Sequence, residues 1–154
     1  MNSQKKKVLV AGTFDIVHAG HIYLINEASK LGDVYLVIAT DKNREIFSGE
    51  RPILSQEQRL EIMKNLKNVK DARLGRNDND TLKTVEEINP DIIVLGPDQK
   101  YSIETLKKGL LEKGLNHIEV RRLETYYDKY ELHSSSLIKK KIIKKNKENK
   151  RINI

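Results

Sequence analysis

Short, continuously apolar runs alternate with longer amphipathic segments along the chain. The runs VLVA, VYLVIA and DIIVLG are apolar on both of their faces, which is typical of parallel strands that helices cover on both sides. Strands are predicted near residues 7–11, 34–40, 71–74, 91–96 and 118–122. Helices are predicted near residues 20–31, 56–66, 80–88 and 103–113, with a last one after His133. This alternation predicts an α/β fold with a Rossmann-like, doubly wound parallel five-stranded sheet and helices on both faces.

The length of 154 residues suits a single domain with its own hydrophobic core. No internal repeat and no linker rich in Pro, Gly or Ser interrupts the pattern. We therefore expect one folded domain over residues 1–138, whose last helix extends to about residue 146. Residues 147–154 are expected to form a basic C-terminal tail.

The formal net charge of +7 is concentrated at the C-terminal end of the chain. Residues 139–154 contain eight Lys or Arg and one Glu, whereas residues 1–138 contain 21 basic and 21 acidic residues. A nucleic-acid-binding fold usually presents a basic face, so the neutral body disfavours nucleic acid as a partner. The alternative of a nucleic-acid-binding protein that acts through its basic tail stays open, and it predicts binding that weakens steeply with salt.

Cysteine is absent, which excludes disulfides, thiolate metal ligands and a thiol nucleophile. No apolar run approaches the roughly 20 residues needed to span a bilayer. The start, MNSQKKKVLV, has only a strand-length apolar stretch and does not resemble a signal peptide. We expect a cytoplasmic protein with no membrane partner.

The segment GTFDIVHAGH follows the first predicted strand and carries the most promising chemistry. In a doubly wound sheet, ligands bind beyond the carboxyl ends of the strands. His18 and His21 are three residues apart at the start of a predicted helix, so they lie on one face of its first turn. A helix N-terminus attracts anions, and Ala19 and Gly20 leave room for a phosphate to approach. The pattern therefore predicts a polyphosphate cradle with two imidazole donors.

Other roles for the two histidines are less well supported. A metal site needs a third ligand, and the remaining histidines, His117 and His133, lie far away in sequence. A capping or surface role would require two of only four histidines to fall here by accident. A G-x-G-x-x-G fingerprint is absent, which disfavours dinucleotide hydride chemistry.

GTFDIVHAGH matches the H-x-G-H signature of the nucleotidyltransferase superfamily, which includes cytidylyltransferases. Class I aminoacyl-tRNA synthetases have a related motif, but this chain is too short and lacks K-M-S-K-S. SKLGD, RPILSQEQRLEIMKNLKNV, INPDIIVLGPDQ and HSSSLIKKKI resemble segments of the archaeal-type FAD synthases, so the resemblance covers roughly residues 8–143. The cytidylyltransferase pattern has G-D-D-W and R-T-E-G-I-S-T-T where this chain has GPDQ and LETYYDKYELHSSS.

The resemblance implies transfer of AMP from ATP to FMN, which gives FAD and pyrophosphate. His18 and His21 would be the catalytic residues and would donate hydrogen bonds to phosphate oxygens as charge develops. A divalent metal, Mg²⁺, would arrive with the nucleotide and not at a protein metal site. The alternative within the superfamily is a glycerol-3-phosphate cytidylyltransferase that uses CTP. The resemblance also implies a homodimer.

The resemblance extends the nucleotide-binding set to Thr13, Phe14, Ala19, Gly20 and Asp98. Thr13 and Phe14 would line the nucleotide site beside the H-x-G-H turn. Asp98, in GPDQ, would contact the ribose or the base edge, although an ordinary turn residue is the simpler interpretation.

Six further residues are candidates in the same site. Tyr127 would stack on adenine or flavin, and its alternative is a surface tyrosine. Arg59 would reach the triphosphate, or it is a solvated surface residue. Ser134 and Ser135 begin the last helix and would hold phosphates from the opposite side, or they simply cap that helix. Lys42 and Arg44 are expected in a loop able to close over the phosphates.

Overall fold

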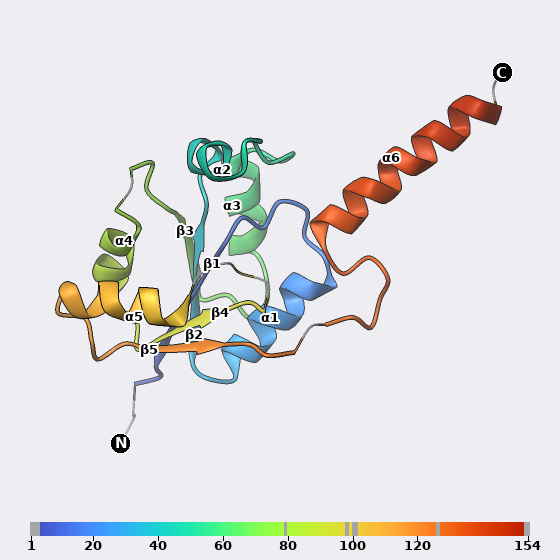
Figure 1. Cartoon of the computed structure of the whole chain (residues 1–154). Coiled ribbons are helices and arrows are strands. Elements are labelled where there is room, and N and C mark those ends of the chain that lie inside the picture. The colour runs from blue at the N-terminus through green and yellow to red at the C-terminus, as the bar shows by residue number, and fades with distance from the viewer. Residues whose placement is uncertain (1–3, 79, 98, 100–101, 126, 153–154) are drawn as a thin grey trace.

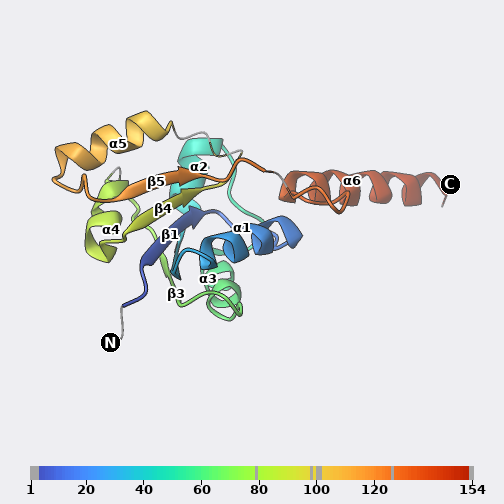
Figure 2. The same ribbon diagram turned by 90° about the horizontal axis from the view of Figure 1, so that it is seen from below.

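A computed structural model describes residues 4–78, 80–97, 99, 102–125 and 127–152 of the chain. Five parallel strands form one sheet in the order β3-β2-β1-β4-β5, as Figures 1 and 2 show. The strands are β1 (Lys7–Gly12), β2 (Asp33–Ile38), β3 (Asp71–Leu74), β4 (Ile92–Leu95) and β5 (Glu119–Arg122). The helices are α1 (Ala19–Ser29), α2 (Asp41–Ser48), α3 (Gln56–Lys64), α4 (Thr81–Ile88), α5 (Ile103–Glu112) and α6 (Ser135–Ile152). The predicted α/β fold is confirmed.

Alternate residues of the central strand β1 enter two separate cores. Val8 and Val10 face α1 and α3, where they join a cluster that contains Ile25 and Met63. Leu9 faces the other side and belongs to a cluster with residues of α4, α5, β4 and β5. Figure 2 shows α1 and α3 on one side of the sheet and α5 on the other. This two-sided burial explains why the strand sequences are apolar throughout.

The strand order changes direction at β1, because the chain moves from β1 outward to β2 and β3 and then returns to β4 on the other side. The loops that follow β1 and β4 therefore diverge at the carboxyl edge of the sheet. Doubly wound folds bind ligands at such a point. The H-x-G-H residues 18–21 lie on one side of this switch point, at the N-terminus of α1.

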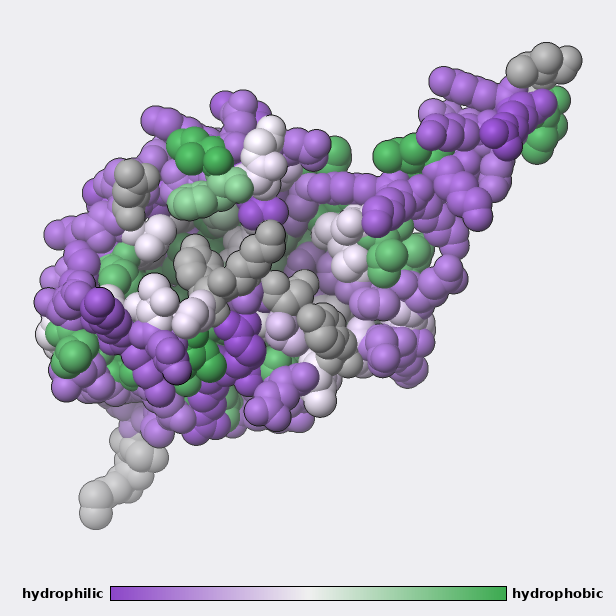
Figure 3. Space-filling view, viewed as in Figure 1, coloured by the Kyte–Doolittle hydropathy of each residue, from purple (hydrophilic) through white to green (hydrophobic). Residues whose placement is uncertain are grey.

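Two helices differ from the sequence predictions. Residues 41–48, expected as a loop, form α2, whose N-terminus is capped by Thr40 and which ends at Gly49 with φ +80°. The last helix was expected to extend to about residue 146, but α6 continues to Ile152. It projects from the body as an arm (Figures 1 and 2), and none of its residues is buried. The arm is mostly hydrophilic, with a few isolated apolar side chains (Figure 3).

Candidate active site

His18 and His21 form a reciprocal cap at the start of α1. His18 is the N-cap residue, and its Nδ1 accepts a hydrogen bond from the Gly20 N–H at 3.0 Å. His21, in the first turn, accepts the His18 N–H at its own Nδ1 over 3.4 Å. The two rings stack with their centroids 3.8 Å apart and an interplanar angle of 24°. The side chains therefore share one face, as their spacing predicts.

The cap also selects the tautomer of both rings. A neutral imidazole has one N–H donor and one acceptor nitrogen. Because Nδ1 is the acceptor in both His18 and His21, the neutral form of each ring carries its proton on Nε2. Burial, followed by repulsion from His18 when that ring is protonated, lowers the pKa of His21 from 6.5 to about 4. His21 is therefore neutral near pH 7 and keeps an Nε2–H donor.

Gly20 is needed for a close approach between distant segments. A Cβ at this position would lie 2.8 Å from the backbone oxygen of His133 and 2.9 Å from the His18 ring. The sequence suggested that the small side chains at residues 19 and 20 leave room for phosphate. In the structure, the space beside Gly20 is used by His133, which leads into α6, and by the ring of His18.

Phe14 supports the site from inside the protein. Its ring is 3 % exposed and belongs to the core beneath α1. The ring meets His21 edge-on with a centroid distance of 5.3 Å. Phe14 has φ +53°, and a Cβ at Gly12 would lie 3.0 Å from its ring. The absence of a side chain at Gly12 therefore leaves the space that the Phe14 ring occupies. From there the ring packs against His21.

Arg59 is not the solvated surface residue that one interpretation of the sequence expected. Its side chain is 0 % exposed, and its Nη1 donates to the carbonyls of Thr13 at 2.8 Å and Ala39 at 2.7 Å. Its Nε donates to the Leu54 carbonyl at 3.0 Å, and its Nη2 pairs with Asp41 at 2.7 Å. The guanidinium therefore joins the ends of β1 and β2 to the segment before α3. The contacts of Arg59 therefore stabilise the fold.

Asp15 is a site residue that the sequence reasoning missed. Its carboxylate, 5 % exposed, accepts the N–H groups of Ile53 and Leu54, each at 2.9 Å. Lys139 of α6 pairs with it at 2.8 Å. Burial alone would raise the pKa of Asp15, but the bonds from Leu54, Lys139 and Ile53 lower it below its ordinary value. An acidic residue between the apolar neighbours Phe14 and Ile16 was the available signal for a buried, bonded carboxylate.

The loop after β4 is joined to the end of β1. Asp98 lies outside the described residues, but Gln99 of the same GPDQ segment donates from Nε2 to the Ala11 carbonyl at 2.8 Å. Its Oε1 accepts the Gly96 N–H at 2.6 Å. Arg122 donates to the carbonyls of Gly96 at 3.0 Å and Gln99 at 2.8 Å. Through these bonds, the two missed residues Gln99 and Arg122 connect Gly96 and Gln99 to the end of β1, at the switch point.

Tyr127 belongs to a tyrosine cluster beside α1. Its ring stacks on Tyr23 with a centroid distance of 4.9 Å and meets Tyr130 edge-on at 6.2 Å. The hydroxyl of Tyr23 bonds to Oγ1 of Thr125 at 2.9 Å. One face of the Tyr127 ring is thus covered by Tyr23.

The two serines at the start of α6 have different partners. Ser134 accepts the Leu137 N–H at 3.1 Å, which is a helix cap, as the alternative interpretation expected. Ser135 donates to the Ile16 carbonyl at 3.2 Å. This bond attaches α6 to the loop between β1 and α1, residues 13–18, which we call the signature loop. Lys42 and Arg44 lie on α2, exposed, and not in a loop.

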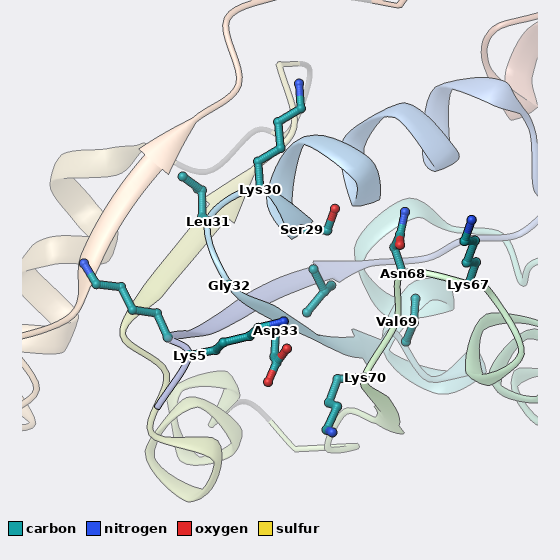
Figure 4. Close-up of a pocket in the computed structure, with 12 residues that line it drawn as sticks. Lys5, Ser29, Lys30, Leu31, Gly32, Asp33, Lys67, Asn68, Val69 and Lys70 are labelled. Carbon is teal, nitrogen blue, oxygen red and sulfur yellow. The ribbon is translucent and has the colours of Figure 1, made fainter. Parts of the chain in front are cut away.

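A cavity of about 460 Å³ lies away from these residues, at the amino ends of β1, β2 and β3 (Figure 4). Its lining includes Lys5, Lys6, Lys30, Lys67 and Lys70. Lys30 caps the C-terminus of α1, where a cation complements the helix dipole. The cavity shares no lining residue with the candidate site.

Metal and membrane features were sought in the described part of the chain. No three His, Asp or Glu side chains come together there in a group able to hold a metal ion. Within the same residues, no helix has both the length and the apolar character to cross a bilayer.

Known proteins resemble this chain in sequence and in fold. The cytidylyltransferase-like family model matches residues 9–141. A protein named FAD synthase from Methanobrevibacter smithii is 46% identical over 143 residues, which cover 90% of this chain and 92% of the relative. Another FAD synthase, from Thermoplasma acidophilum, is 41% identical over 139 residues, or 89% of this chain and 94% of the relative.

Solved structures share the fold of this chain. A Thermoplasma volcanium structure described as a lipopolysaccharide core biosynthesis protein has a TM-score of 0.75 and 38% identity over 80% of this chain and 99% of its own. Pantoate-beta-alanine ligase from Francisella tularensis shares the fold, with a TM-score of 0.55 and 18% identity over 80% of this chain and 60% of its own. With its H-x-G-H turn at the switch point of a doubly wound sheet, the chain belongs to the cytidylyltransferase-like family.

Proposed function

We propose that this protein is an FMN adenylyltransferase, which makes FAD and pyrophosphate from ATP and FMN. The observation that carries the nucleotidyl transfer is the pair of stacked imidazoles that cap α1 at the switch point. The choice of substrates is supported by the FAD synthases that align with about nine-tenths of this chain. The GPDQ and HSSS segments support the same choice over CTP and glycerol 3-phosphate.

The reaction is an in-line displacement at phosphorus. An oxygen of the FMN phosphate attacks the α-phosphorus of ATP and forms the new P–O bond. The bond from the α-phosphorus to the bridging oxygen breaks, and pyrophosphate leaves with that electron pair. Negative charge grows on the equatorial and leaving oxygens, so catalysis depends on positioning and on stabilisation of that charge.

His18 and His21 are the proposed catalytic residues. Both Nδ1 atoms accept backbone N–H groups, and the Nε2–H of each ring is the proposed donor to phosphate oxygens. A neutral His21 donates without requiring a buried cation in the nucleotide-free protein. The dipole of α1 adds a favourable field for the anion.

The residues around the two histidines supply rigidity. Phe14 supports the ring of His21. Arg59 donates to the carbonyls of Thr13 and Ala39, which follow the ends of β1 and β2. The positions of Thr13, Ala19, Gly20, Asp98 and Tyr127 in nucleotide binding remain part of the proposal, as do those of Ser134 and Ser135. Mg²⁺ bound to the nucleotide would neutralise phosphate charge, as is usual for triphosphate substrates.

A paired-substrate assay tests the proposal. The protein is incubated with Mg²⁺ and either ATP plus FMN or CTP plus glycerol 3-phosphate, and pyrophosphate and the nucleotide product are measured. We expect equal amounts of FAD and pyrophosphate from the first pair and little product from the second. Turnover of the second pair alone would reassign the protein as a glycerol-3-phosphate cytidylyltransferase.

Three further expectations belong to this proposal. The protein acts in the cytoplasm, where ATP and FMN are available, and it forms a homodimer. Light scattering after size-exclusion chromatography measures the oligomeric state directly, and a monomeric mass would remove the dimer from the account. Nucleic acid has no role in the proposed reaction.

A further inference from the structure

The base of α6 is attached to the signature loop by two side chains one helical turn apart. Ser135 donates to the Ile16 carbonyl at 3.2 Å, and Lys139 pairs with Asp15 at 2.8 Å. Residues four apart on a helix share a face, so both contacts come from the same side of α6. Figure 1 shows the remainder of the helix extending away from the body.

The Asp15 carboxylate connects this helix to a second segment. Its two oxygens accept the N–H groups of Ile53 and Leu54, and the same group is 5 % exposed. A buried carboxylate is stable when its charge is paired and its lone pairs are bonded. Lys139 supplies the counter-charge, and its own side chain is 38 % exposed, so it reaches the carboxylate from the surface.

Leu54 is held from both sides by buried charges of opposite sign. Asp15 accepts its N–H at 2.9 Å, and Arg59 donates to its carbonyl at 3.0 Å. Arg59 also donates to the carbonyl of Thr13, which begins the loop that leads to the H-x-G-H turn. Contacts among Lys139, Asp15, Leu54 and Arg59 therefore connect α6, residues 53–54 and the loop that leads to the two histidines.

We propose that Lys139 is a positioning residue for the active site, which acts by pairing with Asp15 and thereby holding residues 53–54 against the signature loop. The docked base of α6 is then a part of the catalytic apparatus, although the projecting arm is not. The effect on catalysis rests on the proposed adenylyl transfer, whereas the effect on the geometry of residues 53–54 does not.

Lys139→Gln removes the charge, and Lys139→Met removes it while keeping an apolar stem of similar length, so that one variant remains if the other folds poorly. Lys139→Arg restores the charge. Lys140→Gln is the matched control, because Lys140 is exposed on the same helix. Amide hydrogen exchange of residues 53–54 and the kcat and KM for ATP and FMN are measured for each folded variant.

We expect Lys139→Gln and Lys139→Met to speed exchange of the Ile53 and Leu54 amides by about tenfold, because local opening becomes easier. The value of kcat/KM falls by about the same factor as the site loses its alignment. Lys139→Arg recovers both quantities, and Lys140→Gln changes neither.

Unchanged exchange in both neutral variants would overturn the proposal, and so would faster exchange with unchanged kinetics. If wild-type protein makes no FAD but the neutral variants exchange faster, the proposed substrates are wrong and the same kinetic comparison is made with the substrates it does turn over. The failure of the proposed function is therefore distinguishable from the failure of this inference.

Discussion

The Nδ1 atoms of His18 and His21 each accept a backbone N–H of the turn they flank, at 3.0 Å and 3.4 Å. The same bonds that begin α1 thus assign the proton of each neutral ring to Nε2. The same two hydrogen bonds therefore cap the helix and leave an N–H on Nε2 of each ring, which is the proposed donor to phosphate oxygens. A serine cap would also satisfy the backbone, but its donor and acceptor are the same oxygen, whereas an imidazole that accepts at Nδ1 carries its donor on a separate atom, Nε2.

Loss of either histidine is expected to impair catalysis more than folding. His18→Ala or His21→Ala should reduce kcat by about two to three orders of magnitude, as for other donors to a developing oxyanion. The lost cap should cost about 0.5–2 kcal/mol of stability. His117→Ala, which removes a surface contact with Asn89, is the control and should keep wild-type kcat. Wild-type rates in both active-site variants would remove the proposed mechanism.

Acid should destabilise the protein through His21. Its pKa is lowered from 6.5 to about 4 in the folded protein by burial and by His18, so between these values the unfolded chain binds a proton that the folded protein does not. The unfolding free energy therefore falls as pH decreases through this window, by at most about 3 kcal/mol.

Urea denaturation at pH 7 and pH 4.5 measures this decrease. His21→Gln removes the group and should show a smaller decrease over the same window. Asp15 also has a lowered pKa, and its protonation reduces the unfolding free energy mainly below pH 3.8, the ordinary pKa of the group. This effect lies outside the window. An equal decrease in wild type and His21→Gln would contradict the assignment.

Gly20→Ala should separate the lead-in to α6 from the H-x-G-H turn. The added Cβ would lie 2.8 Å from the His133 backbone oxygen, and backbone atoms cannot move as freely as a side-chain tip. We expect a loss of about 1–3 kcal/mol in stability and a lower kcat. Gly75→Ala, where the nearest atom is 3.4 Å away, should be tolerated. Equal behaviour of the two variants in thermal denaturation and turnover would refute the close-approach argument.

Arg59→Met should destabilise the fold strongly. It leaves Asp41 without its buried partner and removes the donors to the carbonyls of Thr13 and Ala39. Removing one member of a buried pair costs about 3–5 kcal/mol. Arg73→Met removes an exposed pair with Glu87 and should leave the urea midpoint nearly unchanged. Similar midpoints for both variants would show that burial of Arg59 contributes little.

The sequence predicted the sheet well because buried parallel strands have a strong local signature. The runs around Val8, Leu36 and Ile93 are apolar on both faces, and each lies in a strand. Helix α2 was missed because it is only eight residues long, is mostly polar and buries no residue, so it lacks the wide apolar stripe of a core-facing helix. Thr40 and Gly49 were its available signals, a cap at each end.

The site was predictable only where neighbours in sequence make it. His18 and His21 meet through local helix geometry, so their spacing was sufficient. The partners of Asp15 and Arg59 come from segments 38 and 46 residues away in the chain. Local patterns carry no information about such partners, and for this reason Asp15 was missed and Arg59 was expected at the surface or on the triphosphate.

The most direct test of the central claim is long-range ¹H–¹⁵N NMR of the imidazoles, with and without a non-hydrolysable ATP analogue and Mg²⁺. The account predicts that His18 and His21 are Nε2–H tautomers at pH 7, and that their Nε2–H signals move on nucleotide binding while those of His117 do not. Nδ1–H tautomers, or signals of both histidines that stay unchanged at saturating nucleotide, would contradict it.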